Sequence, residues 1–310
     1  MSNSMPSWAC KKSASREKHM KKSIFFLLSL IITIGLFAAA EFKVEESENI
    51  QKILKFQDPT RAKKIIVDNI FGYIHVEGTS SKDVKLRVHK TIKADTKDSL
   101  KKAKEDVSLE IKEDGNTIDL YVDGPFRRSK EEKERHGWHD PGYAVHYDFT
   151  LTVPYQTSLT LKTVTEGDIS VENIEGNFEV KNVNGQIEMT DVSGSGDAHT
   201  VNGKVSVSFT KNPNLNCSFK TINGDVKINF QPDLSADFWL KTFTGDAFSD
   251  FPVSYLPSKP AKEYRKNGKF VYKSNNGTGL RIGKGGPEIK MDTMTGDILI
   301  EKFKPSTRRI

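Results

Sequence analysis

The sequence has very little cysteine, which excludes two common ways of stabilising or equipping a protein. Its 310 residues include only Cys10 and Cys217, and Cys10 falls in the N-terminal leader discussed below. The single remaining thiol forms neither an intramolecular disulfide nor a zinc site of the paired-cysteine type. Cys217 alternates with Leu215 and Phe219, so we expect a small buried hydrophobic residue rather than a reactive thiol. No cysteine follows the leader where a lipoprotein carries one, so we expect no lipid anchor.

The sequence also lacks an apolar run long enough to cross a bilayer. Its longest apolar segment, residues 24–37, has about 14 residues, whereas a membrane helix needs about 20. Lys21 and Lys22 precede this segment, and Ala38 and Ala40 follow it in an Ala-x-Ala site. This is the pattern of a secretory signal peptide, with Ala38 and Ala40 as the cleavage-site residues. We therefore expect no stable membrane span after cleavage, and a retained N-terminal anchor is the alternative.

Removal of the predicted leader, residues 1–40 with a core at 20–40, leaves a chain with almost no net charge. The whole sequence has a formal net charge of +6, but six of its 47 basic residues and one of its 41 acidic residues lie in this leader. The excess of positive charge therefore belongs to the leader, and we expect no nucleic acid or other polyanion as a partner. Residues 1–19 read as an upstream extension, with Met20 as the start of translation.

Catalytic signatures are missing as well. The sequence contains no nucleophile elbow, no P-loop and no dinucleotide fingerprint. A carbohydrate-active enzyme of the parallel β-helix type, a polysaccharide lyase or hydrolase, stays open as an alternative. An inverting glycosidase needs two carboxyl groups about 6.5–9.5 Å apart, and many pairs on a stack of strands meet that distance by chance.

What the sequence does contain is a repeated phrase: Thr or a similar residue, a hydrophobic residue, Asn or Thr, then Gly and usually Asp. The glycines of its six copies are Gly167, Gly185, Gly203, Gly224, Gly245 and Gly296. The first two steps between these glycines are 18 residues long and the next two are 21. Self-similarity at a fixed period is typical of a solenoid.

The spacing between copies predicts short strands joined by tight turns. From Gly167 to Gly203 a glycine recurs every nine residues, separated by pieces of alternating polarity that suit strands of four or five residues. Each turn needs a residue with positive φ, which glycine adopts without steric cost. Asn-Gly turns also occur in hairpins, so an antiparallel meander is the alternative. The inward-facing residues keep one phase relative to the glycine, which favours a single-stranded parallel β-helix with coils of about 18–21 residues.

The rest of the chain divides by composition. Residues 41–64 form a polar lead-in of uncertain structure. Residues 65–158 form a smaller β-rich N-terminal part, which includes a charged loop at 127–140. Residues 159–310 hold the solenoid repeats, interrupted by an insertion near 250–276.

Three further elements are predicted in the N-terminal part. The only helical candidate is residues 95–106. Alternating segments at 107–111 and 117–122 flank an Asp-Gly pair and predict a hairpin. Residues 145–153 alternate strictly up to Pro154, which predicts a strand that ends at the proline.

The sequence also predicts where the stack of repeats begins and ends. Residues 69–72 read as an isolated first copy of the phrase, and the Gly296 copy reads as the last coil of the stack. Arg308 and Arg309 follow that copy, and charged residues there would prevent pairing of its exposed edge with another chain.

These features together resemble the bacterial putative adhesin family. The resemblance lies in the signal peptide, the strand that ends at Pro154, the Gly-Asp repeats and the closing stretch 285–300, and it covers residues 65–303. Members of that family are described as exported domains of unknown function with β-strand repeats. The resemblance implies fold and export, and it supplies no catalytic residues.

The aspartates of the repeats are the first candidate site. Four of them share the position after the glycine: Asp168, Asp225, Asp246 and Asp297. Stacked coils would align these carboxylates in a ladder able to bind Ca²⁺, which takes six to eight oxygen ligands. Gln186 and Lys204 occupy the same position and interrupt the ladder, and Asp also hydrogen-bonds turn amides. We therefore expect turn chemistry and no metal.

A group of histidines is the second candidate site. His136 and His139 form a His-x-x-His pair close to Asp140, and His146 follows. Such a group could bind Zn²⁺, but it lies in a charged, glycine-containing segment that does not force the imidazoles together. We expect surface histidines and no cofactor.

These observations predict an exported cell-envelope protein, located in the periplasm, on the cell surface or outside the cell. We expect an adhesin-like, scaffold or binding role without catalysis, directed at an envelope polymer, a glycan or a protein. The carbohydrate-active enzyme is the first alternative, and a self-assembling or regulatory envelope-stress component is the second.

Overall fold

The computed structural model describes residues 42–58, 60–127, 141–257, 262–266, 269–273 and 277–304. Residues 43–310 form one compact unit. The predicted leader, with Ala38 and Ala40, lies outside the described residues, as do the histidines of the charged loop. Within the described part, no helix combines the length and the apolar composition that a bilayer span needs.

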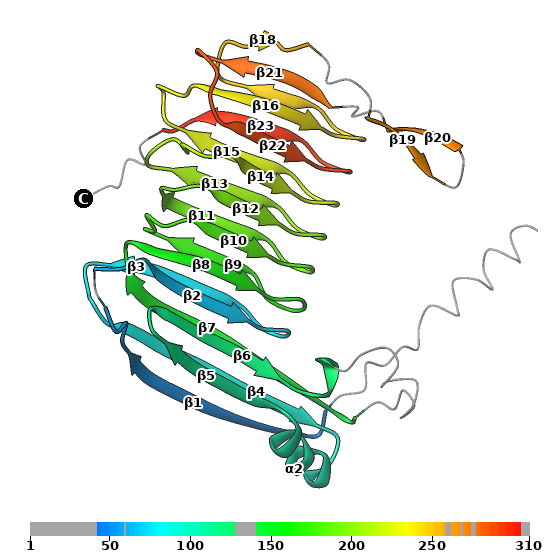
Figure 1. The fold of residues 1–310 in the computed structure, drawn as a ribbon. Coiled ribbons are helices and arrows are strands. Elements are labelled where there is room, and N and C mark those ends of the chain that lie inside the picture. The colour runs from blue at the N-terminus through cyan, green and yellow to red at the C-terminus, as the bar shows by residue number, and fades with distance from the viewer. Residues whose placement is uncertain are drawn as a thin grey trace, which may run out of the picture. The chain divides into compact units, whose positions relative to one another are not determined.

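Two large sheets, which we name sheet A and sheet B, build an all-β fold (Figure 1). The strands of sheet A are β1 (Val44–Leu54), β3 (Ile74–Thr79), β4 (Val84–Ala94), β7 (Tyr143–Pro154), β9 (Ile169–Glu172), β11 (Ile187–Val192), β13 (Val205–Phe209), β15 (Val226–Phe230), β17 (Ala247–Ser249) and β23 (Ile298–Lys302). The strands of sheet B are β2 (Lys63–Asp68), β5 (Ser108–Asp114), β6 (Thr117–Asp123), β8 (Thr157–Lys162), β10 (Phe178–Lys181), β12 (Gly196–His199), β14 (Cys217–Lys220), β16 (Ala236–Lys241), β18 (Ser254–Tyr255), β21 (Thr278–Ile282) and β22 (Glu288–Asp292). A separate hairpin pairs β19 (Lys262–Lys266) with β20 (Lys269–Lys273).

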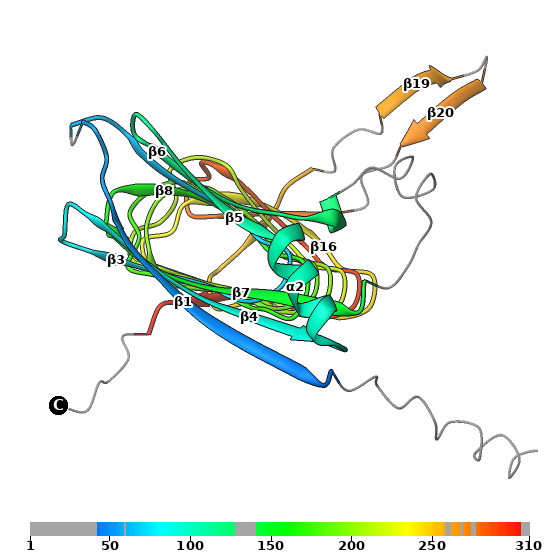
Figure 2. The same ribbon diagram turned by 90° about the horizontal axis from the view of Figure 1, so that it is seen from below.

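The strands of each sheet follow a defined spatial order. Sheet A runs β1-β4-β7-β3-β9-β11-β13-β15-β23-β17, and sheet B runs β18-β21-β16-β22-β14-β12-β10-β8-β2-β6-β5. Through the repeats the chain alternates between the two sheets, and we call one strand from each sheet, with its turns, a coil. Figure 2 shows the two sheets as facing layers.

The alternation predicted for the repeats places the core between the sheets. In β15, for example, Val226, Ile228 and Phe230 are fully buried, whereas the residues between them are partly exposed. The other inward residues that the sequence predicts are also buried: Ile169, Val171, Ile187, Met189, Val205, Val207, Ile298 and Ile300. The apolar face of each short strand is thereby removed from water, which is the main force that stabilises such a stack.

Neighbouring repeats pair in parallel and in register. Ile187 of β11 lies opposite Ile169 of β9 on one side and Val205 of β13 on the other. Val205 in turn lies opposite Val226 of β15. Equivalent residues of successive copies are therefore neighbours, and the antiparallel meander is wrong for this region.

The elements predicted in the N-terminal part are confirmed. The helix α2 (Lys97–Asp106) begins after Thr96, whose hydroxyl oxygen accepts a hydrogen bond from the Ser99 amide. Strands β5 and β6 form the expected antiparallel hairpin, and β7 ends at Pro154. A short 3₁₀ turn, η1 (Pro125–Arg127), follows β6.

Strands also form in the polar lead-in and on either side of the isolated copy of the phrase. The polar lead-in contains β1, which pairs antiparallel with β4 over its whole length. Strands β2 and β3 pair in parallel with β8 and β9, so the isolated copy of the phrase at residues 69–72 joins a coil of the same stack. The two sheets are therefore continuous from this coil into the repeats.

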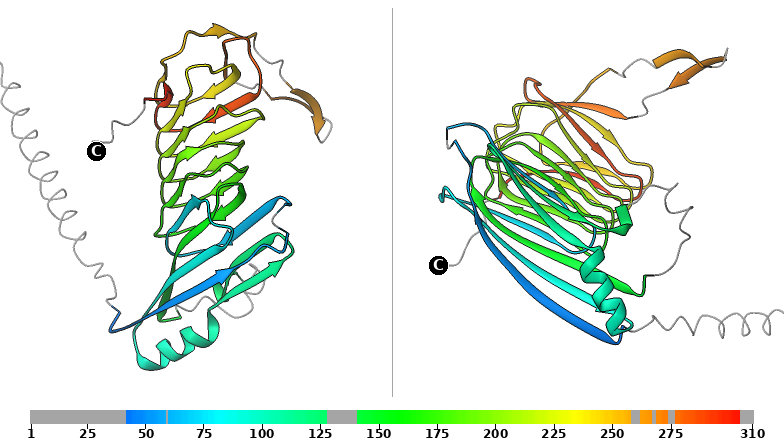
Figure 3. Two further views of the ribbon diagram at one scale, coloured as in Figure 1. Left: turned by 90° about the vertical axis from the view of Figure 1, so that its left-hand side faces the viewer. Right: turned by 60° about the horizontal axis from the view of Figure 1, so that its bottom comes forward.

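The C-terminal strands do not close the stack. Strand β22 lies between β14 and β16, and β23 lies between β15 and β17 (Figures 1 and 3). The expectation that the Gly296 copy is the last coil is therefore wrong, because β17 and β18 lie beyond it. Strand β21 pairs antiparallel with both β16 and β18, which shows that the chain reverses before it enters this gap.

Candidate functional site

The first residue of each repeat phrase bonds one coil to the next. Its hydroxyl donates a hydrogen bond to the carbonyl oxygen of the glycine in the neighbouring coil. The pairs and their donor–acceptor distances are Thr163 with Gly72 (2.9 Å), Thr200 with Gly185 (2.8 Å), Thr221 with Gly203 (2.8 Å), Thr293 with Gly224 (2.8 Å) and Thr242 with Gly296 (3.1 Å). The Asn182 amide makes the same bond to Gly167 at 2.9 Å. This shared hydrogen bond is a structural reason for the recurrence of the phrase along the chain.

The glycines allow these coils to approach each other. A Cβ atom on Gly167 would lie 2.1 Å from the Gly72 carbonyl oxygen, and one on Gly245 would lie equally close to that of Gly296. Positive φ is a second requirement at only four of the six positions: Gly203 (149°), Gly224 (144°), Gly245 (139°) and Gly296 (143°). Close backbone approach therefore explains the glycine in every coil, including those at Gly167 and Gly185.

The aspartates of the repeats are engaged in the same backbone contacts. The Asp168 carboxylate accepts a hydrogen bond from the Gln186 amide at 2.9 Å. The Asp225 carboxylate accepts one from the Asp297 amide at 2.8 Å, and Asp297 accepts one from the Asp246 amide at 2.9 Å. The structure therefore brings Asp225, Asp297 and Asp246 onto neighbouring coils and keeps Asp168 apart from them. Among the described residues, no group of three potential ligands is arranged to hold a metal ion.

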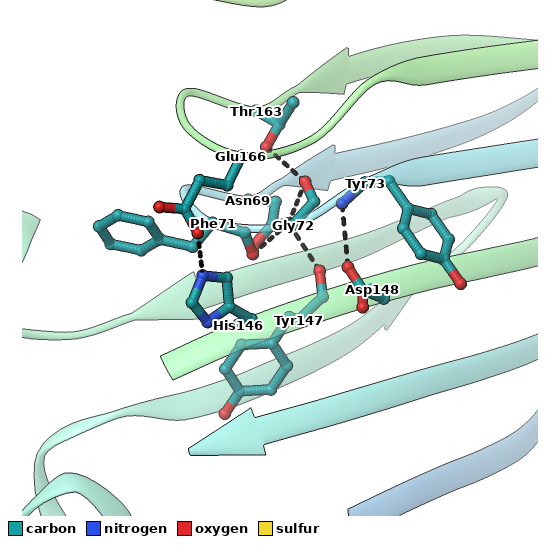
Figure 4. Close-up of polar contacts among 9 residues, drawn as sticks. All are labelled: Asn69, Phe71, Gly72, Tyr73, His146, Tyr147, Asp148, Thr163 and Glu166. Atoms are coloured by element: carbon teal, nitrogen blue, oxygen red, sulfur yellow. Dashed lines mark hydrogen bonds and ion pairs between the residues drawn. The ribbon is translucent and has the colours of Figure 1, made fainter. Parts of the chain in front are cut away.

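The predicted histidine cluster is only partly described. His136, His139 and Asp140 lie outside the described residues. His146 lies on β7, and its Nε2 is 2.6 Å from a carboxylate oxygen of Glu166 in the turn before β9 (Figure 4). This hydrogen-bonding contact ties β7 to the first repeat turn.

Cys217 lies in the core, as its sequence context predicts. It is buried on β14, and burial raises the pKa of its thiol above the usual value. A protonated, enclosed thiol is a poor nucleophile, so this residue contributes packing rather than chemistry.

The turn before β3 is held by a buried asparagine. The Asn69 side-chain amide donates to the carbonyl oxygens of Phe71, Gly72 and Tyr147 at 3.0, 3.2 and 2.8 Å (Figure 4). Its Oδ1 atom is buried and has no hydrogen-bond partner within the described residues. The turn is thereby fixed against β7, and the Tyr73 amide donates to the Asp148 carboxylate at 3.1 Å.

Tyr73 occupies the position after glycine that other copies give to Asp, and it is exposed. Its ring stands apart from the contacts around Asn69 in Figure 4, and 42% of the residue is accessible to solvent. Sequence reasoning missed this residue, although its departure from the Gly-Asp pattern within a recognised copy was a readable signal. It is a large aromatic side chain on a rigidly held turn.

Two hollows in the surface meet at Tyr73. The larger has a volume of about 690 Å³ and is lined by Tyr73, His75, Glu166, Gly167, Asp168, Ile169, Ser170, Asn184, Gln186 and Glu188. The smaller has a volume of about 180 Å³ and is lined by Asn49, Ile50, Gln51, Tyr73, Arg87, Val88, His89, Asp148 and Thr150. We name the two hollows together the Tyr73 groove.

The Tyr73 groove crosses six adjacent strands of sheet A. The smaller hollow lies on β1, β4 and β7, and the larger lies on β3, β9 and β11 and the turns before them. Tyr73 directly precedes β3 and lines both hollows. The lining is rich in amides, hydroxyls and carboxylates that donate and accept hydrogen bonds.

Comparison with known proteins gives a family match and several solved structures of low similarity. The sequence model of the family described as Toastrack DUF4097 matches residues 41–301. A putative cell adhesion protein from Clostridium sporogenes is 11% identical over 83% of this chain and 100% of its own, with a TM-score of 0.43. A putative adhesin from Bacteroides fragilis is 13% identical over 83% and 97% of the two chains, with a TM-score of 0.36. No curated protein matches the chain.

Proposed function

Because the chain is a member of the Toastrack family DUF4097, we propose that it is an exported cell-envelope protein that binds an external ligand and catalyses no reaction. Export is supported by the basic, apolar and Ala-x-Ala segments of residues 21–40. The destination is the periplasm, the cell surface or the medium. The role is adhesin-like, with an envelope polymer, glycan or protein as the partner.

We also propose that the two sheets form one single-stranded parallel β-solenoid. The in-register parallel pairs from β9 to β15 support this view, as does the hydrogen bond from each first phrase residue to the neighbouring coil. A solenoid suits a binding role because each coil contacts only its neighbours and displays its outward residues in regular rows.

The Tyr73 groove is the observation on which the proposed binding role depends. An exposed tyrosine that lines two hollows with amide and carboxylate side chains offers both apolar contact and hydrogen bonds to a ligand. The carboxylates of the repeats support a non-catalytic role, because Asp168, Asp225 and Asp297 already accept hydrogen bonds from backbone amides. A catalytic acid or base needs its oxygen within reach of a substrate proton instead.

Export and envelope binding are tested together in the full chain. A Leu30→Arg variant places a charge in the apolar segment and should keep the protein in the cytoplasm, whereas the parent chain should fractionate outside it. The exported parent should then sediment with purified envelope material and release no product from envelope polysaccharides. Equal fractionation of both chains, or sustained product formation, would contradict the proposal.

A further inference from the structure

We infer that the Tyr73 groove binds an oligosaccharide chain built from neutral or amino sugars, an inference that rests on the proposed binding function. The groove is defined above by its two hollows, one on each side of Tyr73. The shape, the chemistry and the charge of the groove each support this ligand class, and they are taken in turn below.

The groove is extended rather than round. Adjacent strands lie about 4.8 Å apart, so the five steps from β1 to β11 span about 24 Å. This length suits a linear chain that lies across the strands, with contacts in both hollows at once. A compact ligand such as a single sugar or nucleotide would fill one hollow and leave the other empty.

The lining residues match the two kinds of surface that a sugar presents. The faces of a sugar ring carry C–H groups, which pack against an aromatic face such as that of Tyr73. The edges carry hydroxyls that both donate and accept hydrogen bonds. The side-chain amides of Asn184 and Gln186 in the larger hollow, and of Asn49 and Gln51 in the smaller one, also carry both donors and acceptors. Part of this capacity is used within the protein, since Gln186 Nε2 donates to Asp168 and Asn184 Oδ1 accepts from Asn202.

The charge of the groove selects among sugar polymers. Four carboxylates line it: Asp148, Glu166, Asp168 and Glu188. Arg87 is the one guanidinium or ammonium group among the lining residues, which also include His75 and His89. A polymer with carboxylate or phosphate groups would meet like charges, which disfavours it. Asp148 and Asp168 each accept a backbone amide through Oδ1, but a carboxylate has about four acceptor sites, so hydroxyl or amino groups of a sugar would still find acceptors.

The fixed backbone around Tyr73 adds to affinity. Asn69 holds the turn through three carbonyl oxygens, and the His146–Glu166 pair ties the next turn to β7. Binding therefore costs little conformational entropy of the protein, because the surface is already ordered before the ligand arrives.

The test measures binding of oligosaccharides to the full exported chain by calorimetry. The probes are a hexamer of N-acetylglucosamine, its deacetylated amino-sugar form and oligogalacturonate, which has the same linear character but carries carboxylates. We expect the first two to bind and the third to bind at least about tenfold more weakly. Equal or tighter binding of oligogalacturonate would overturn the inference.

Substitution of two tyrosines locates the site. Tyr73→Ala should weaken binding of the preferred sugar about tenfold, and Tyr73→Phe should bind like the parent because it keeps the ring. Tyr155→Ala is the matched control, since Tyr155 is also 42% exposed but lies outside the groove. Both alanine variants should melt like the parent, because the Tyr73 turn is held through the backbone amide.

The outcomes separate this inference from the proposed function. If the chain sediments with envelope material but binds none of the sugars, or if both alanine variants bind equally well, the groove assignment is overturned while the envelope role stands. If Tyr73 governs sugar binding in a chain that stays in the cytoplasm, the groove stands and the envelope role is overturned.

Discussion

At the residue scale, the turns of this protein depend on how closely two backbones approach. Each repeat glycine faces the glycine carbonyl of the adjoining coil, with no room for a Cβ atom. Positive φ accompanies this contact at some positions, such as Gly224, but not at Gly167. The two requirements can therefore be measured separately in the same chain.

Gly167→Ala and Gly115→Ala separate the steric cause from the conformational one. Gly167 has no positive φ, but its Cβ would meet the Gly72 carbonyl oxygen at 2.1 Å, so we expect a loss of about 2–3 kcal/mol. Gly115 has a φ of +58° and open space, so we expect a loss of about 1 kcal/mol. Chemical denaturation measures both values. An equal loss in the two variants would show that close approach is not the dominant requirement.

At the element scale, an ion pair links a strand that lacks the repeat phrase to its neighbour in the sheet. Strand β21 lacks the phrase and pairs antiparallel with β16. Between them the Arg281 guanidinium donates two hydrogen bonds to the Asp237 carboxylate, at 2.7 and 2.8 Å. A bidentate pair of this kind fixes geometry as well as charge.

This pair predicts a dependence of stability on pH. Hydrogen bonds from Arg281 hold the pKa of Asp237 below its usual value. The contribution is therefore complete above the unfolded-state pKa, about 3.9, and is lost as the pH falls through the lower folded-state value. Asp237→Asn should lower the melting temperature at pH 7 and reduce the further decline below pH 4.

The matched control for Asp237→Asn is Glu110→Gln. Glu110 pairs with Lys112 on the same strand, and both side chains are well exposed. Exposed pairs contribute little, so this variant should melt close to the parent at both pH values. If the two variants behaved alike, the β16–β21 pair would not contribute in the way described.

At the scale of the whole molecule, the order of strands differs from the order of the sequence. The chain builds the coils up to β14 and β15, continues to β16 and β17, and then returns to insert β22 and β23 beneath them. Among the described strands, the backbone pairing of β16 and β17 with the stack therefore runs through the C-terminal segment, since their parallel partners are β22 and β23. The last coil to be synthesised holds the end of the stack in place.

A chain that stops after Lys284 tests this arrangement. It lacks β22 and β23, so β14 and β15 lose their outer partners while β16 and β17 lose their parallel ones. We expect a smaller denaturant m-value, because part of the core between the sheets no longer forms. A chain that stops after Lys304 keeps every described strand and should unfold like the parent. An unchanged m-value in the shorter chain would show that the end coils pair independently of β22 and β23.

The sequence by itself determined the local structure of this protein: its short strands, its turns and the points at which strands end. Periodic glycines and alternating apolar residues predicted the short parallel strands, and the Asp-Gly pair and Pro154 predicted the hairpin and the end of β7. The resemblance to an adhesin-like family is confirmed by the family match over residues 41–301. These features are readable because each depends on residues close together in the chain.

Only the tertiary structure decided which coils are neighbours and where a ligand-sized surface lies. The placement of β23 between β15 and β17 depends on pairing between residues about 50 to 70 positions apart, and repeat copies that look alike in sequence do not specify their order. The Tyr73 groove joins β1 to β11 in the same way, through side chains that no local pattern brings together. The repeat phrase shows how each coil is joined to the next, and the strand order shows which outward residues share a surface.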